Sequence, residues 1–478
     1  MGAMKGGGLT VSDPGADLGF HGAGRLVPGH GERGSPAGQR NRLPVAVSVA
    51  LVALTATLGS GCASSGPHGP TGQARAATTA NASPSATAVG LPAASPASGA
   101  ATPAPAGPRE FPVGAGTSTS LQGVTCVGAN DCWAVGWSTS ETTGYPQAMI
   151  AEDTGIGWDV VSSPAPSDSV SSQLNGVACA GSGDCWAVGS YWQGATAATS
   201  ISLPLIEQDT GSGWKVVSGP APAGGEVSSL NGVTCLSAGD CWAVGYSSGA
   251  GSAGAGSQTL IEQNTGSGWS IVSSPDPSST GDGGQLADVS CVSAAGCWAV
   301  GYWDAVNGVP RTLIEQYAGS GWSIVSSPGP SPSPNQSVGA GSVLLGVTCA
   351  SESGCWAVGY SNGSKGTTEG LVEEYGASGW SIVPSSTPAA HLLSVACAGA
   401  ASCWAVGAST TASGGTLVAE SMGLGWGTVS TPDEYDTTAP QLNAVACESD
   451  GECWAVGGPS AQTGSGQMVL DQLSGSTT

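Results

Sequence analysis

Fourteen of the fifteen cysteines occur as seven pairs with five residues between the two members. The pairs are Cys126/Cys132, Cys179/Cys185, Cys235/Cys241, Cys291/Cys297, Cys349/Cys355, Cys397/Cys403 and Cys447/Cys453. Thiols at one fixed spacing either form disulfides or bind a metal such as zinc. Zinc needs four converging ligands, often including His, yet His391 is the one histidine after Leu121. The pattern therefore predicts seven disulfides, and we expect no metal and no other cofactor.

The charged residues exclude several functions. From Leu121 onward the chain holds 29 acidic residues and three basic ones, Lys215, Arg311 and Lys365. A net charge of −23 for the whole chain repels nucleic acids and anionic membranes. With His391 as its one histidine and no nucleophile motif beside it, the region lacks a credible Ser-His-Asp triad. A glycoside hydrolase that uses two of the many carboxylates stays open as an alternative.

These cysteines belong to a repeated unit. Each pair lies in a 17-residue motif such as LNGVTCLSAGDCWAVGY, and its seven copies begin 48 to 58 residues apart, at Leu121, Leu174, Leu230, Leu286, Leu344, Leu392 and Leu442. The period is that of propeller blades, and the Gly-, Ser- and Val-rich composition favours strands. The copies therefore predict an all-β, seven-bladed propeller whose cysteines join strands one and two of each blade across their turn.

A second motif completes each of the first six units. It places an apolar pair with polar residues on strand three and Gly-Trp at the start of strand four, as in LIEQNTGSGWSIVSSP. One Trp on strand two and one on strand four recur in every such unit, and we expect them to pack between blades. The glutamates of strand three (Glu207, Glu262, Glu315 and Glu373) lie far from the axis, and we expect them to be solvated surface residues.

The seventh unit ends without a Gly-Trp segment. Upstream of the first unit, the segment REFPVGAGTSTS holds Phe111 and Val113 where a fourth strand should precede the first strand one. We predict that this N-terminal strand completes the seventh blade and closes the ring, which removes an open sheet edge.

The motif order resembles that of the Asp-box (BNR) propellers and the photosystem II assembly-factor propellers over residues 108–478. The Asp-box turn is matched best by Asp209-Thr210-Gly211-Ser212-Gly213-Trp214, while other copies hold Asn264, Tyr317 or Tyr375 instead of Asp209. The resemblance implies a propeller fold. Sialidases that resemble this fold hold the substrate carboxylate with three arginines, and three basic residues that include one arginine cannot supply them.

Strand two ends at Ala-Val-Gly, after which the copies diverge. Five of the seven place aromatic residues there, and our candidates for a ligand-binding face are Trp137, Tyr191, Trp192, Tyr246, Tyr302, Trp303, Asp304 and Tyr360. Charged residues of the same loops are Asp282, Arg311, Glu434 and Asp436. The rings either stack on a sugar or a protein partner, or cap the apolar layer between blades.

The N-terminal part resembles an export and anchoring device. Residues 1–61 hold a basic lead and the apolar run LPVAVSVALVALTATL, which is typical of a signal peptide. Gly59-Ser60-Gly61-Cys62 resembles the lipobox of bacterial lipoproteins, which implies that Cys62 is lipidated; an ordinary secretory signal with a free Cys62 is the alternative. Residues 62–107 are rich in Ala, Ser, Pro, Thr and Gly, which predicts a disordered tether in front of the propeller at 108–478.

These observations predict a secreted bacterial surface protein, anchored by lipid or signal peptide, that displays a monomeric propeller. We expect the propeller to bind an envelope polysaccharide or a surface protein without catalysis. The alternatives are the two-carboxylate glycoside hydrolase and, by analogy with the photosystem propellers, an assembly factor for an envelope complex.

Overall fold

The computed structural model describes residues 118–473 with gaps at 129–130, 156, 195–200, 250–255, 276, 278–282, 306–308, 331–340, 363–366, 400–401, 412–413, 422–424, 430–439, 449–450 and 460–468. The export segment, Cys62, the tether and the N-terminal strand predicted to close the ring lie outside the described residues.

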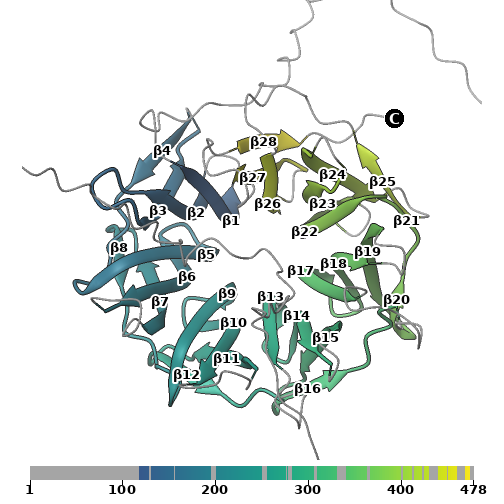
Figure 1. Cartoon of the computed structure of the whole chain (residues 1–478), viewed down its shortest axis with the longest axis horizontal. Coiled ribbons are helices and arrows are strands. Elements are labelled where there is room, and N and C mark those ends of the chain that lie inside the picture. Colours follow the sequence, from purple (N-terminus) through teal and green to yellow (C-terminus); the bar gives the residue numbers. More distant parts are fainter. Residues whose placement is uncertain are drawn as a thin grey trace, which may run out of the picture. The chain divides into compact units, whose positions relative to one another are not determined.

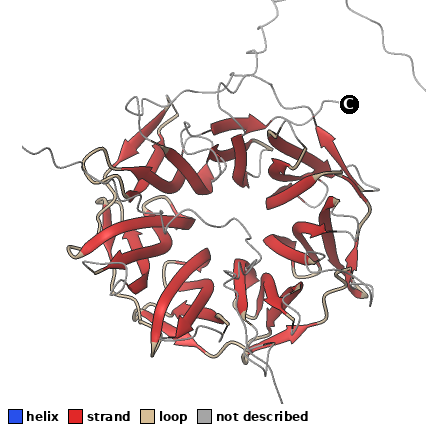
Figure 2. Cartoon of the chain, in the orientation of Figure 1, coloured by secondary structure: helices blue, strands red, loops and turns tan. Residues whose placement is uncertain are grey.

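The described chain consists of antiparallel sheets arranged around a central axis, with strand one of each sheet innermost (Figure 1). All of its regular secondary structure is strand (Figure 2), and the described residues contain no helix that could cross a membrane. Within each blade the strands pair in antiparallel fashion and follow one another outward in sequence order, and one parallel pair, Ser202 with Val227, links the sheets of the second and third blades. The structure confirms a seven-bladed β-propeller.

The blades are numbered in chain order. Blade 1 comprises β1 (Thr119–Gly128), β2 (Asp131–Thr139), β3 (Pro146–Asp153) and β4 (Trp158–Val161). Blade 2 comprises β5 (Ser169–Gly181), β6 (Asp184–Gln193), β7 (Ile201–Asp209) and β8 (Trp214–Val216). Blade 3 comprises β9 (Gly225–Ser237), β10 (Asp240–Gly249), β11 (Gln258–Asn264) and β12 (Trp269–Val272). Blades 4 and 5 comprise β13 (Gly284–Ser293), β14 (Gly296–Asp304), β15 (Pro310–Tyr317) and β16 (Trp322–Val325); β17 (Ser342–Ser351), β18 (Gly354–Asn362), β19 (Thr368–Gly376) and β20 (Gly379–Ile382). Blades 6 and 7 comprise β22 (Ala390–Gly399), β23 (Ser402–Ser409), β24 (Thr416–Ser421) and β25 (Trp426–Val429); β26 (Pro440–Cys447), β27 (Cys453–Pro459) and β28 (Val469–Leu473).

Blade 6 carries an additional strand that the repeat does not predict. The segment after blade 5, β21 (Ser385–Ser386), pairs in parallel with β25, the outer strand of blade 6. Blade 7 shows three strands in the described residues. Its predicted fourth strand falls on residues that are not described, so that prediction stays open.

Seven apolar clusters, one at each interface between neighbouring blades, hold the ring together. The cluster that closes the ring joins Leu121 and Trp158 of blade 1 to Trp454 and Val456 of blade 7. The first and last units are therefore packed against each other like any other neighbours.

The repeated tryptophans pack between blades, as predicted. The strand-two Trp of one blade meets the strand-four Trp of the next edge to face, with ring centroids 5.3–5.7 Å apart at six interfaces. These pairs are Trp133–Trp214, Trp186–Trp269, Trp242–Trp322, Trp298–Trp380, Trp356–Trp426 and Trp454–Trp158. Each edge-to-face pair of indoles stabilises the fold by about 1 kcal/mol beyond the contribution of the apolar area that it buries.

All seven predicted disulfides are present. The two cysteines of each pair are direct cross-strand partners, as in Cys126 opposite Cys132, and their Cα atoms lie 4.0–4.1 Å apart. Since disulfides persist in oxidising compartments, seven of them indicate an extracellular protein.

The two cysteines of each pair differ in their burial, which the spacing alone did not predict. The first cysteine is half-buried, whereas the second is buried in the apolar cluster between its blade and a neighbour. The buried members are Cys132, Cys185, Cys241, Cys297, Cys355, Cys403 and Cys453. These seven residues are therefore part of the core and are not accessible to a ligand, so the disulfides stabilise the blades and do not form a binding site.

The glycine of the Ala-Val-Gly motif permits the close approach of strands one and two. A Cβ on Gly136 would lie 2.0 Å from the carbonyl oxygen of Ser120, and the other six blades repeat this contact at 1.9–2.0 Å. In most blades the register shifts beside this glycine, as between Leu121 and Gly123. No side chain fits there, which explains why all seven copies hold Gly.

The expectation that the strand-three glutamates are solvated is wrong. Glu207, Glu262, Glu315 and Glu373 are fully buried, because the segment after strand four of the preceding blade covers each of them. In three cases a serine of that segment donates to the carboxyl group, at oxygen–oxygen distances of 3.0–3.2 Å; the pairs are Ser163–Glu207, Ser274–Glu315 and Ser327–Glu373. Burial raises the pKa of Glu207 and Glu262 to about 8 and that of Glu373 to about 7.

Candidate functional site

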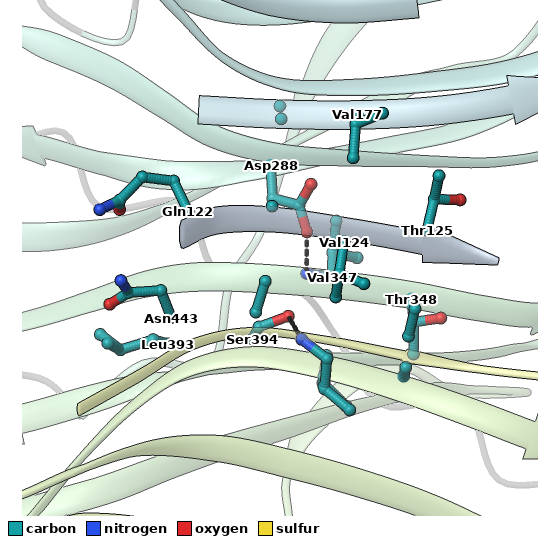
Figure 3. Close-up of a pocket in the computed structure, with 18 of the residues that line it drawn as sticks. Gln122, Val124, Thr125, Val177, Asp288, Val347, Thr348, Leu393, Ser394 and Asn443 are labelled. Atoms are coloured by element: carbon teal, nitrogen blue, oxygen red, sulfur yellow. Dashed lines mark hydrogen bonds between the residues drawn. The ribbon is translucent and has the colours of Figure 1, made fainter. Parts of the chain in front are cut away.

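The innermost strands enclose an axial channel, a cavity of about 320 Å³. Its lining comes from strand one of all seven blades, and in β1 it extends from Gln122 to Cys126. Figure 3 shows part of this lining, including Gln122, Asp288, Ser394 and Asn443. The channel is therefore polar and lies on the axis of the ring.

Three asparagines of the channel wall hold neighbouring blades together. The side-chain amides of Asn175, Asn231 and Asn443 donate to a leucine carbonyl oxygen of the next blade, at 2.9, 2.8 and 2.7 Å. The leucines are Leu230, Leu286 and Leu121. Each amide satisfies a backbone acceptor on an inner strand, so these residues stabilise the ring.

Asp288 is the one carboxylate among the described residues of the channel lining. One oxygen accepts a hydrogen bond from the backbone N–H of Val289, at 2.8 Å. The other accepts from the backbone N–H of Val347 in the next blade, at 2.9 Å (Figure 3). Burial raises the pKa of Asp288 to about 7, although these two hydrogen bonds act in the opposite direction. In blade 6 the hydroxyl oxygen of Ser394 likewise accepts a hydrogen bond from the backbone N–H of Val445 in the next blade. Sequence reasoning missed Asp288, although four other blades hold Gly at this position.

Three of the predicted ligand-face residues come together near one end of the channel. Tyr246, Tyr302 and Tyr360 follow the Ala-Val-Gly motif in blades 3, 4 and 5, and each is paired with the residue that precedes the first leucine of strand one. Burial raises the pKa of Tyr302, and the nearby Asp304, Tyr360 and Tyr246 raise it further. The ring of Tyr360 lies over that of His391 in blade 6, with centroids 4.0 Å apart. We call Tyr246, Tyr302, Tyr360 and His391 the aromatic arc.

The arc is largely buried rather than exposed. Tyr360 is 4% exposed, and the other two tyrosines are partly covered. Burial raises the pKa of Tyr246 and Tyr360 and lowers that of His391. All four rings are therefore uncharged near neutral pH.

Two further candidates pack into the interfaces between blades. Tyr191 lies against the apolar cluster between blades 1 and 2, and Trp303 against the cluster between blades 3 and 4. The Arg311 guanidinium lies over the ring of Trp303, 5.9 Å from its centroid. The interpretation that rings cap the apolar layer thus describes Tyr191 and Trp303.

Of the remaining described candidates, Asp304 lies near the arc, since its negative charge raises the pKa of Tyr302. Trp137 and Trp192 are half-buried on blades 1 and 2. Asp304 ends β14, next to Trp303. Asp282, Glu434 and Asp436 lie outside the described residues.

A second cavity, of about 600 Å³, lies between blades 1 and 2 and was not predicted. Its walls include Trp133 and Glu152 from blade 1 and Asp209 and Trp214 from blade 2. We call this cavity groove 1/2. The sequence does not single out this groove, because Asp153 of blade 1 holds the same register position as Asp209, where blades 4 and 5 hold tyrosine.

Within the described chain, one group of three metal-ligating side chains converges, and it comprises Cys126, Cys132 and Glu448. The two sulfur atoms are joined in a disulfide, so they cannot serve as thiolate ligands.

No family model and no curated protein matches the chain. Among solved structures, a Trypanosoma rangeli sialidase in complex with difluorosialic acid is 12% identical with a TM-score of 0.40, and the match covers 74% of this chain. The chain spans about half of that sialidase, 54% of its length. A polysaccharide lyase described as a PL25 ulvan lyase is 8% identical with a TM-score of 0.43 and coverage of 74% and 93%. A Penicillium chrysogenum α-L-arabinanase is 12% identical with a TM-score of 0.39 and coverage of 61% and 90%. At these identities and scores, the likenesses carry no conclusion about what this chain binds.

Proposed function

We propose that the protein is a non-catalytic extracellular binding module for a glycan of the cell envelope. The observation that supports this function is the aromatic arc, in which uncharged rings from four consecutive blades lie near one another close to one end of the channel. The partly exposed rings of Tyr246 and Tyr302 offer apolar surface to the C–H groups of a sugar and a hydroxyl at the ring edge. The carboxylate of Asp304 beside Tyr302 supplies a strong hydrogen-bond acceptor for sugar hydroxyls.

The arc is tested by removing its hydroxyl groups without removing its rings. We expect the triple variant Tyr246→Phe, Tyr302→Phe, Tyr360→Phe to bind envelope glycans on an array at least tenfold more weakly than the parent protein. Tyr375→Phe is the matched control, because Tyr375 lies against Trp298 between blades 4 and 5. Unchanged binding by the triple variant would remove the arc from the function.

Two other outcomes would replace the proposed function. Release of new reducing ends from a bound glycan would favour the two-carboxylate glycoside hydrolase. Capture of a surface protein in place of any glycan would make the propeller a protein-binding module.

We further propose that the propeller is monomeric and is anchored through a lipid on Cys62. Its support is Gly59-Ser60-Gly61-Cys62 directly after the apolar run and the Pro-rich tether that follows. Metabolic labelling with a fatty acid should label the parent protein in a bacterial host. Cys62→Ser should be unlabelled and released into the medium; equal labelling of both would contradict the anchor.

A further inference from the structure

Groove 1/2 has walls from two blades whose side chains face each other. Trp133 and Glu152 are direct cross-strand partners on β2 and β3, so they point to the same side of blade 1. Asp209 and Trp214 are likewise partners on β7 and β8 in blade 2. All four border the cavity of about 600 Å³. The groove is thus lined by two indoles and two carboxyl groups.

The acidic side chains of the groove are held in place. Asp209 is 4% exposed, and its Oδ1 accepts hydrogen bonds from the N–H groups of Gly211 and Gly213, at 3.0 and 2.9 Å. Asp131 adds a third carboxylate to the lining and accepts a hydrogen bond from Ser182 of blade 2. Burial raises the pKa of Glu152, and the negative charges of Asp131 and Asp209 raise it further. The lining therefore presents fixed acceptors for hydroxyl groups and disfavours an anionic ligand.

The indoles supply apolar ring surfaces. Trp133 and Trp214 are 7% and 8% exposed, and their Nε1 atoms are buried without a hydrogen-bond partner among the described residues. The same holds for indoles at other interfaces, but here both residues border an open cavity. Because these N–H groups are themselves shielded from the cavity, the two indoles offer a ligand their ring surfaces and not hydrogen-bond donors.

The protein itself shows that a six-membered ring fits at this position. Tyr317 in blade 4 and Tyr375 in blade 5 hold the register position that Asp209 holds in blade 2. Each of the three lies opposite the second cysteine of its blade. Their phenol rings lie 4.7 Å from Trp242 and 4.5 Å from Trp298. At groove 1/2 the smaller Asp209 leaves the corresponding place beside Trp133 open.

We propose that groove 1/2 binds one ring of a neutral saccharide, with that ring in the place that the tyrosine side chains occupy between blades 3 and 4 and between blades 4 and 5. The carboxyl groups accept from its hydroxyls, and the indole rings of Trp133 and Trp214 pack against its C–H groups. This site rests on the proposed function for its class of ligand, but it is separate from the aromatic arc.

The experiment fills the groove with the residue that the fold already tolerates there. The full chain and its Asp209→Tyr variant are applied to an array of neutral hexose and pentose oligosaccharides, and each hit is titrated by calorimetry. We expect Asp209→Tyr to weaken binding at least tenfold with a thermal midpoint close to that of the parent. Asn264→Tyr is the matched control, because Asn264 holds the same register position and turn contact between blades 2 and 3, and it should bind as the parent does.

The outcomes separate this inference from the proposed function. Loss of binding in Asp209→Tyr with full binding in the Tyr→Phe triple variant supports groove 1/2 and removes the arc. The reverse pattern supports the arc and overturns groove 1/2. Absence of any neutral-saccharide binding, or competition at the groove by calcium ions or by acidic sugars alone, also overturns the inference.

Discussion

At the residue scale, the most informative departure from the repeat is a missing hydroxyl. Glu262 is fully buried, and neither of its carboxyl oxygens has a hydrogen-bond partner among the described residues. The serine that serves Glu207, Glu315 and Glu373 is replaced here by Gly219. A Cβ built on Gly219 would lie 3.7 Å from Oε2 of Glu262. A serine at this position therefore has its hydroxyl within reach of an unsatisfied carboxyl group.

We expect Gly219→Ser to stabilise the propeller by about 1 kcal/mol, the usual net value of one hydrogen bond that satisfies a buried group. The new Cβ would approach Cδ1 of Ile206 to 2.9 Å, and this terminal methyl can rotate away. Urea unfolding measures the change. Ser163→Gly should produce the opposite shift, because it leaves Glu207 in the state of Glu262. A lower midpoint for Gly219→Ser would mean that Ile206 cannot give way.

The sequence did not predict the burial of these glutamates for a physical reason. The pattern of strand three shows that Glu262 follows two core residues, Leu260 and Ile261, which says nothing about what covers that face from outside. The cover is a segment of the preceding blade that begins after strand four, and its path is a tertiary contact.

At the element scale, the hairpin of strands one and two is the best predicted part of the molecule. Its Cys spacing, its Gly and its alternating Val residues all specify the same register, so every disulfide follows from the motif. The short strand β21 was not predicted. It follows Pro384, which comes directly after Val383, whereas blades 3 and 4 hold two serines between the corresponding valine and their proline.

We expect removal of one hairpin disulfide to cost about 2 kcal/mol, since the closed loop is short and the entropy it removes from the unfolded chain is small. Cys126→Ala with Cys132→Ala tests this by urea unfolding under non-reducing conditions. Because Cys132 is buried in the cluster that closes the ring, Cys126→Ser with Cys132→Ser should cost more than the alanine pair, since it buries a hydroxyl group among apolar side chains. If the double-alanine variant unfolds at the same urea midpoint as the parent, strand pairing alone is sufficient to stabilise the hairpin.

At the scale of the whole molecule, the buried carboxyl groups make stability depend on pH. The folded-state pKa is about 8 for Glu207 and Glu262 and about 7 for Glu373 and Asp288, above the ordinary values of 4.5 and 3.8. At pH values between the unfolded-state pKa and the folded-state pKa of these groups, the folded state binds more protons than the unfolded state. The free energy of unfolding therefore falls as the pH rises through this range. We expect a higher thermal midpoint at pH 5.5 than at pH 8.5.

Surface carboxylates repel one another less at low pH, and a control must separate this effect. The variant Glu207→Gln, Glu262→Gln, Glu373→Gln keeps the surface charge and removes three of the buried titrating groups. Its midpoint should change less between pH 5.5 and 8.5 than that of the parent. An equal change would assign the pH dependence to the surface.

Closure of the ring gives the last prediction. At six interfaces the strand-two tryptophan has a strand-four tryptophan as its edge-to-face partner, whereas no described residue plays this part for Trp404 at the interface of blades 6 and 7. Trp404 is still buried, at 2% exposure. We predict that the N-terminal strand with Phe111 and Val113 pairs with β28 and supplies the missing apolar contact.

Deletion of residues 108–116 should then leave an open strand edge in blade 7 and abolish soluble, cooperative folding, because an unpaired edge is a template for aggregation. Size-exclusion chromatography and thermal unfolding measure both effects. A deletion of nine tether residues, 90–98, is the control and should fold as the parent does. Phe111→Asp keeps the backbone of the strand and should lower the midpoint without aggregation if its ring packs at this interface. A 108–116 deletion that remains monomeric with the parent's midpoint would show that three strands suffice for blade 7 and that the packing of blade 7 on blade 1 closes the ring by itself.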